Sequence, residues 1–141
     1  MIELRTRFGD ADADHMVATV ERILAGISDL SFAGLADGLT EDAVIDWPYV
    51  AEGAPAMFEG RRTIVEALAV TPQIFTHFRM WATRYIPSPM TGTLVVEAAS
   101  QGRYAGGDAY GNRYVLVIDF REGRVAHWRE YLDPRRVKPP A

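Results

Sequence analysis

The sequence predicts an α+β domain in which helices precede a curved antiparallel sheet. Apolar residues recur with a helical period over residues 10–68, whereas from Ile74 onward they alternate with a period of two. Short connections rich in Gly and Pro separate the alternating segments, which favours a meander of long strands. Helices followed by strands are typical of folds in which a sheet wraps over helices.

The composition indicates an ordinary globular protein. Its 141 residues, 48 % hydrophobic and 24 % charged, suffice for one domain with a core and not for two. The net charge of -4 argues against general nucleic-acid binding. Without an apolar run of about 18 residues, no transmembrane helix is expected, and the N-terminus lacks the apolar segment of a signal peptide. The chain has no cysteine, which excludes disulfides and thiolate chemistry, so we expect a cytoplasmic protein.

Three helices are predicted in the first half of the chain. Residues 1–9 are expected to form a flexible arm, and one domain is expected to span residues 10–134. An Asp at position 10, 12 or 14 can cap a helix that ends near Ser28. Its apolar stripe consists of Met16, Val17, Val20, Ile23, Leu24 and Ile27. Ser31 can cap a second, shorter helix that carries Phe32, Leu35 and Leu39 inward, and a third carries Ile64, Ala67 and Leu68.

Strands fill the second half. A short strand is predicted at Ala43–Tyr49, where Pro48 ends it or makes it an edge. Val50–Phe58 is predicted to be a loop, a place where pocket rims and lids occur. Residues 135–141 are expected to be a disordered tail. The long strands are predicted at Phe75–Ile86, Thr93–Ala105, Tyr110–Arg121 and Arg124–Leu132.

The last two strands form a hairpin that carries the best candidate site. Gly123 can take the positive φ that its tight turn needs, and the apolar run Val115–Ile118 predicts a strand buried on both faces. By alternation, one face of the final strand holds Arg124, Ala126, Trp128 and Glu130, and the other holds Val125, His127, Arg129 and Tyr131. This pattern places a carboxylate beside a tryptophan.

Four short segments resemble the NTF2-like superfamily, in its SnoaL-like and ketosteroid-isomerase-like branch. They are Asp42–Pro48 (DAVIDWP), Phe58–Arg61 (FEGR), Phe120–Val125 (FREGRV) and Trp128–Tyr131 (WREY). The similarity covers about residues 12–134. It implies a cone built from three helices and a curved sheet, with a small molecule in the open end. Because such folds host many reactions as well as inactive proteins, the site must decide the function.

Steroid isomerisation is excluded by the residues at the matching positions. The general base of ketosteroid isomerases would fall at Trp47, and the two oxyanion donors would fall near Ile23 and Leu116. None of these side chains can perform those roles.

Two other branches match in part. In limonene-epoxide-hydrolase-type enzymes an Asp-Arg-Asp set activates water; Glu130 matches the last acid, and the other positions fall near Ala98 and Ser100. The phenazine biosynthesis A and B proteins place a proposed general acid at Glu130, while their His and Ser would fall near Ala67 and Thr71. That second match runs through Val96-Glu97, Gly102, Asn112 and Arg129-Glu130.

Glu130 is the candidate catalytic residue. If it faces the cone, desolvation would raise its pKa toward the range useful for acid–base chemistry. The alternatives are a structural salt bridge to Arg103 or another strand arginine, and a solvated position at the end of the strand. By parity, Asp46 points away from the pocket that Trp47 faces. His77 can be a titrating partner of Glu130 or a surface or dimer-face histidine.

Aromatic residues are expected to line the cone, which favours a small hydrophobic or aromatic metabolite as ligand. They are Trp47, Tyr49, Phe58, Trp81, Tyr104, Tyr114 and Trp128. Asn112 and Tyr114 share the parity of Leu116, so both should face inward and can orient a ligand by hydrogen bonds. The expected ligand-binding residues are Trp47, Tyr49, His77, Ser100, Asn112, Tyr114 and Trp128.

No metal ion or cofactor is expected. The three histidines are far apart and lack paired spacing with carboxylates, and the Gly-rich segment 106–111 lies between strands, unlike a phosphate-binding loop. A mixed apolar and charged outer sheet face, with Arg113, Val115, Val117, Asp119 and the outer residues of the last strand, predicts a homodimer. The sequence therefore predicts a cofactor-independent acid–base enzyme (isomerase, cyclase, dehydratase or condensation type) or a non-catalytic ligand-binding or dimerisation domain.

Overall fold

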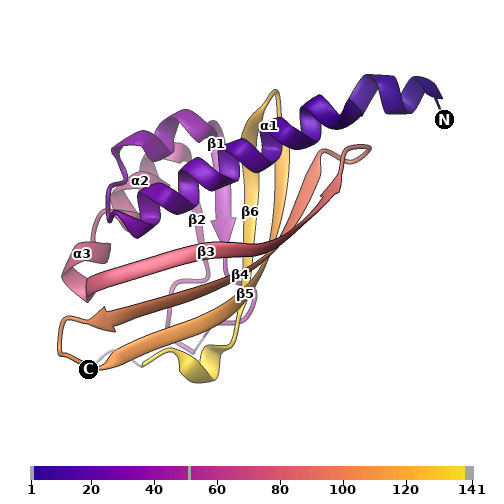
Figure 1. Ribbon diagram of the computed structural model, residues 1–141. Coiled ribbons are helices and arrows are strands. Elements are labelled where there is room, and N and C mark those ends of the chain that lie inside the picture. The colour runs from indigo at the N-terminus through magenta and orange to yellow at the C-terminus, as the bar shows by residue number, and fades with distance from the viewer. Residues whose placement is uncertain (1, 51, 139–141) are drawn as a thin grey trace.

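The computed structural model describes residues 2–50 and 52–138 as one curved six-stranded sheet with helices packed against its concave face. The strand order is β2-β1-β6-β5-β4-β3. In Figure 1 the long helix α1 crosses in front of the sheet, and α2 and α3 lie at one side of it. This α+β architecture agrees with the fold that the sequence predicts. No helix in the described residues is long and apolar enough to cross a membrane.

The helical elements precede or interrupt the strands. They are α1 (Ile2–Ser28), the 3-10 helix η1 (Ala33–Gly38), α2 (Arg61–Leu68), α3 (Thr71–Ile74) and the 3-10 helix η2 (Pro134–Arg136). The strands are β1 (Leu39–Asp46), β2 (Met57–Glu59), β3 (Phe75–Ser88), β4 (Thr93–Tyr104), β5 (Ala109–Arg121) and β6 (Arg124–Leu132).

The core lies between α1 and the concave sheet face. The helix buries Met16, Val20, Ile23 and Leu24, which belong to its predicted apolar stripe. The inner face of the sheet buries Leu94, Val96, Leu116, Ile118 and Val125 completely, each with 0 % exposure. Alternation along β4 and β5 thus gives one buried face, because successive side chains point to opposite sides of a strand. Val115 is 42 % exposed, so β5 is not buried on both faces as expected.

Both ends of the chain contain helical turns. The helix α1 begins at Ile2, so it starts earlier than the predicted cap at Asp10, Asp12 or Asp14; the flexibility of residues 1–9 stays a prediction. Good helix formers among residues 3–7 favour this extension, whose turns project past the sheet in Figure 1. At the other end, Asp133 caps η2 by accepting from the Arg135 N–H. Lys138 forms an ion pair with Asp108. The disorder of residues 135–141 stays a prediction, and residues 139–141 lie outside the described part.

Three local details also differ. The second helix is the 3-10 helix η1, and its first residue receives no side-chain cap from Ser31; two glycines lower its α-helical propensity. The short strand β1 runs over Leu39–Asp46 and stops before Pro48. The expected loop Val50–Phe58 includes the first residues of strand β2. Because β2 pairs with β1, β2 is the edge strand and β1 lies between β2 and β6.

A β-bulge shifts the parity of β6. The pairing moves from Asp119–His127 to Phe120–Val125, so Ala126 is an extra residue on β6. Val125 therefore points into the core, not to the outer face as alternation from Tyr131 predicts. Beyond the bulge the prediction holds, and Trp128 is buried with 4 % exposure.

Candidate functional site

A cavity of about 130 Å³ lies between the helices and the concave sheet face. Apolar and aromatic side chains dominate its wall: Ile23, Ile27, Phe32, Leu35, Leu39, Val44, Ile45, Trp47, Ile64, Leu68, Phe78, Met80 and Trp128. The remaining lining residues are Thr71, Tyr114 and Glu130. The Thr71 hydroxyl donates to the Leu68 carbonyl oxygen at 2.6 Å, so it is already used within the backbone.

Glu130 reaches this cavity because β1 and β6 pair in parallel. Asp46 is opposite Arg129 in the register, which places Trp47 beside Glu130. The indole Nε1 of Trp47 donates to Glu130 Oε2 at 2.7 Å. From two residues earlier on β6, Trp128 Nε1 donates to Oε1 at 3.2 Å. Two neutral indole N–H groups therefore hold the carboxylate.

The electrostatic surroundings favour the protonated form of Glu130. Burial raises the pKa of this carboxyl above its usual range, and the hydrogen bonds from Trp47 and Trp128 act in the opposite direction with smaller effect. No ion pair to Glu130 occurs among residues 2–50 and 52–138. Arg103 instead donates to the Gly107 carbonyl oxygen at 2.6 Å. The alternative of a structural salt bridge is thus not realised in the described residues.

A second polar group lies beside the cavity on β4 and β5. The Tyr114 hydroxyl is 2.7 Å from Ser100 Oγ and 3.1 Å from the Tyr110 hydroxyl. Asn112 Nδ2 donates to the Tyr110 hydroxyl at 3.1 Å. Burial raises the pKa of Tyr114 and of Tyr110 above the usual tyrosine range, so both phenols stay protonated at physiological pH. This hydroxyl network can supply a hydrogen-bond donor and cannot supply a base.

Four of the predicted site residues meet at the cavity: Trp47, Tyr114, Trp128 and Glu130. Ser100 and Asn112 are buried, with 4 % and 3 % exposure, and bond to Tyr114 and Tyr110 without lining the cavity. Both point inward, as parity predicts for Asn112.

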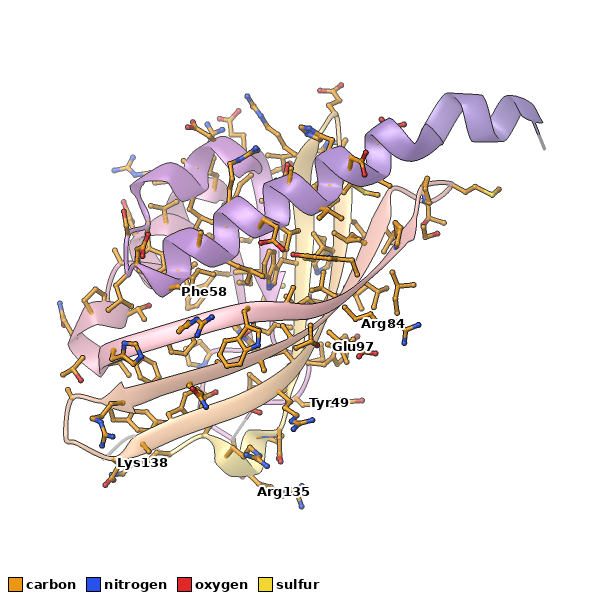
Figure 2. All side chains as sticks on the ribbon, viewed as in Figure 1. Tyr49, Phe58, Arg84, Glu97, Arg135 and Lys138 are labelled. Atoms are coloured by element: carbon orange, nitrogen blue, oxygen red, sulfur yellow. The ribbon has the colours of Figure 1, made fainter. Side chains whose placement is uncertain are left out.

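Tyr49 and His77 do not reach the cavity. Tyr49 follows Pro48, is 61 % exposed, and packs edge-on against Tyr131 with 5.5 Å between ring centroids. In Figure 2 it lies well apart from Phe58, whose ring contacts Trp47. His77 is exposed because β3 turns Phe78 and Met80 inward, which sends the odd-numbered neighbour outward.

Asp46 points outward, as its parity predicts. Its carboxylate Oδ2 is 2.5 Å from His127 Nε2 on the outer face of the sheet. Arg129 and Asp119 form a second outer-face ion pair, at 2.9 Å. These charges lie on the side of the sheet opposite the cavity, so they do not contact Glu130.

Some lining residues were not assigned from the sequence. Phe78 and Met80 could have been found from the alternation of β3. Tyr110 bonds to Tyr114 without lining the cavity, and it could have been found from the parity that it shares with Asn112. Thr71 gave no such signal, because its position depends on the short helix α3. In the described part of the chain, no group of three or more His, Asp or Glu side chains is arranged to hold a metal ion.

The chain matches the SnoaL-like domain family over residues 20–128, a range that includes most of the sheet and the whole cavity wall except Glu130. This match covers more than half of the chain, and the protein belongs to the SnoaL-like domain family. This match confirms the predicted membership in the NTF2-like superfamily and the predicted α+β cone. The likeness to phenazine biosynthesis proteins stays a prediction.

Individual relatives extend the comparison. An uncharacterized protein of Bacillus subtilis, YesE, is 30 % identical over 99 residues, which are 70 % of this chain and 67 % of YesE. The crystal structure of a putative isomerase from Bacillus subtilis superposes with a TM-score of 0.83 at 25 % identity, covering 89 % of this chain and 91 % of that one. An NTF2-like protein from Anabaena variabilis gives a TM-score of 0.72 at 22 % identity, covering 86 % and 88 %.

Proposed function

We propose that the protein is a cofactor-independent acid–base enzyme that acts on a small hydrophobic or aromatic metabolite, with Glu130 as the proton-transferring group. The observation that carries the proposal is the Glu130 carboxyl in an apolar cavity, held by two indole N–H groups. Burial brings its pKa up from the ordinary carboxyl range. A carboxyl whose pKa is raised by burial is suited to accept a proton and to return it, as general acid–base catalysis requires.

The proton balance of such a step is simple. The ionised Glu130 takes a proton from one atom of the substrate, and the neutral acid returns a proton to another atom. The enzyme ends in its starting state, and the substrate is isomerised without a redox change. The name of the Bacillus subtilis putative isomerase is consistent with this reaction type.

The size of the cavity favours a small ring as substrate. A volume of about 130 Å³ is close to that of an engineered protein cavity of about 150 Å³ that binds benzene. It is well below the roughly 300–1,000 Å³ of pockets for drug-sized ligands. Since the wall is almost wholly apolar, a charged metabolite or a sugar would lose hydration without compensation.

Deuterium exchange tests the proposal without a known substrate. A panel of cyclic compounds of six to ten heavy atoms is incubated with the protein in D₂O, and exchange into carbon positions is followed by NMR. We expect the wild type to exchange at least one compound and Glu130→Gln to lose the exchange by about 100-fold or more. Glu97→Gln is the matched control, because Glu97 is exposed and 3.9 Å from Arg84 on the outer face.

The competing function is a non-catalytic ligand-binding domain. It is favoured by the scarcity of polar groups: among the described cavity-lining residues, Glu130 is the sole acid. In that case the wild type would bind panel compounds without exchanging them, and Glu130→Gln would bind them equally well. That result would contradict the catalytic proposal.

We further propose that two copies associate through the outer sheet face. Val115 is 42 % exposed there and is opposite Tyr131 in the register, and Trp81 lies under the Arg79 guanidinium, 5.0 Å from its ring centroid. Exposed apolar and aromatic side chains on a long-stranded face suit an interface between copies. Sedimentation should show a dimer that Val115→Glu converts to a monomer; a monomeric wild type would contradict the proposal.

A further inference from the structure

A second cavity, distinct from the one that Glu130 lines, lies between α1 and the 3-10 helix η1. Its volume of about 360 Å³ falls within the roughly 300–1,000 Å³ of small-molecule sites. The two cavities have Ile23 and Leu35 in common and no other lining residue. We call the second cavity the α1–η1 groove, and much of its wall is polar. It is lined by Thr19, Arg22, Ile23, Gly26, Asp29, Ser31, Gly34, Leu35, Asp37 and Gly38.

Three charged side chains line the groove without neutralising one another. Arg22, Asp29 and Asp37 are exposed, and none of them forms an ion pair with another side chain that the structure describes. Together they supply one positive and two negative groups. A ligand with one negative and two positive groups therefore complements the groove.

Arg22 and Asp37 lie near the same end of the groove. Arg22 Nη2 donates to the Thr19 hydroxyl at 3.4 Å, so the guanidinium is directed one turn toward the N-terminus of α1. Thr19 is also close to η1, since a Cβ atom on Gly38 would lie 3.6 Å from Thr19 Cγ2. Asp37 precedes Gly38 in the chain. A carboxylate and an ammonium group on the same carbon atom of a ligand can therefore be bound together by Arg22 and Asp37.

Asp29 lies at the opposite end of the groove. Its N–H bonds to the Ala25 carbonyl oxygen at 3.0 Å, which continues the helical pattern past Ser28. At 1.5 Å per residue, Asp29 lies about 10 Å from Arg22 along the same face of α1. The last turn of this helix contains no basic residue. The negative end of the helix dipole thus adds to the Asp29 charge, and both favour a cation.

We propose that the α1–η1 groove binds a free basic amino acid with an extended side chain, of which lysine is the simplest example. The α-carboxylate pairs with Arg22, the α-ammonium group pairs with Asp37, and the side-chain ammonium group pairs with Asp29. An amino acid with a neutral side chain would leave the Asp29 carboxylate unpaired. The proposal is independent of the proposed function, because Glu130 does not line this groove.

Ligand analogues test the proposal on the wild-type protein. Binding is followed by NMR through the amide resonances of Gly26, Gly34 and Gly38, which line the groove. We expect L-lysine to bind about threefold to tenfold more tightly than norleucine, which has the same carbon skeleton without the side-chain ammonium group. No shift of these resonances at millimolar lysine, or equal affinities for lysine and norleucine, overturns the proposal.

A third compound distinguishes a free amino acid from a lysine at the C-terminus of a peptide. Nα-acetyl-lysine keeps the carboxylate and the side-chain ammonium group and lacks the α-ammonium group that Asp37 would bind. It should bind about threefold to tenfold more weakly than lysine. Equal or tighter binding of Nα-acetyl-lysine would overturn the assignment of a free amino acid.

Substitutions in the groove assign each charge. Asp29→Asn should abolish the preference for lysine over norleucine, and Asp37→Asn should abolish the preference for lysine over Nα-acetyl-lysine. Arg22→Met should bring the affinity for lysine down to that for 1,5-diaminopentane, which lacks the carboxylate. Arg62→Met is the matched control, because Arg62 is exposed on α2 and does not line the groove. Asp29→Asn that keeps the full preference overturns the proposal.

Gly34 allows the groove to be blocked without altering its charges. A Cβ atom there would have no heavy atom within 4 Å, and the φ of Gly34 lies outside the left-handed region, so a larger side chain causes no backbone strain. Gly34→Leu should fill the groove and lower the affinity for lysine by about tenfold or more, measured by the shifts of the Gly26 and Gly38 amides. Wild-type affinity in Gly34→Leu would show that lysine binds elsewhere.

Discussion

The hydrogen bond from Trp47 to Glu130 makes a stability prediction that depends on pH. In Trp47→Phe an aromatic ring remains at the cavity wall, and the indole donor 2.7 Å from Oε2 is lost. The carboxyl then keeps one donor, the Trp128 indole at 3.2 Å. Since hydrogen bonds to the ionised form lower a carboxyl pKa, the substitution raises the pKa of Glu130 further.

The sign of the pH effect follows from this raised pKa. The stability contributed by protonated Glu130 is fully present below the unfolded-state pKa and is lost as the pH rises through the folded-state pKa. Where Glu130 is ionised, Trp47→Phe loses a bond to a charged group of about 1.5–3 kcal/mol. Where it is neutral, the lost bond is worth about 0.5–1.5 kcal/mol. The smaller ring removes about 1 kcal/mol of packing at either pH.

Urea denaturation over a series of pH values measures the difference. We expect the free energy of unfolding to fall by about 1.5–2.5 kcal/mol where Glu130 is protonated in the fold and by about 2.5–4 kcal/mol where it is ionised. Trp81→Phe is the control, because Trp81 contacts Arg79 and does not line the cavity; its effect should be independent of pH. A loss for Trp47→Phe that stays the same on both sides of the pH range in which the wild-type stability changes would refute the assigned charge-dependent hydrogen bond.

Two other predictions concern stability. The wild-type free energy of unfolding should fall as the pH rises through the Glu130 pKa, and Glu130→Gln should remove this slope, measured by urea denaturation across pH; a slope that persists would contradict the burial of this carboxyl. Gly102→Ala should destabilise by about 1–3 kcal/mol, since its Cβ would lie 2.6 Å from the His77 carbonyl oxygen. Gly106→Ala, with nothing within 4 Å, is its control, and equal melting temperatures would contradict the crowding argument.

Alternation was sufficient to predict much of the sheet and part of the site. The four long strands lie where the period of two indicates, and Trp128 and Glu130 share the inner face. The inward direction of Tyr114 and the outward direction of Asp46 also follow from parity. These features depend on local periodicity, which a single sequence contains.

Features that depend on tertiary pairing could not be predicted. The contact between Trp47 and Glu130 requires β1 to lie parallel to β6, and nothing in either strand specifies that partner. The bulge at Ala126 reverses the direction of Val125 although the sequence alternates without interruption. His77 was grouped with the site because of its chemistry, and its side chain lies on the outer face because β3 buries Phe78 instead.

The parallel pairing of β1 with β6 also bears on the order in which the molecule can be completed during synthesis. Trp47 and Glu130 are 83 residues apart in the sequence, and Trp128 and Glu130 are the last residues of the cavity wall along the chain. A nascent chain that ends with β5 already carries every other lining residue and has no acid among them. During synthesis the apolar part of the cavity wall is therefore made first, and the Glu130 carboxyl is added only with β6, the last strand.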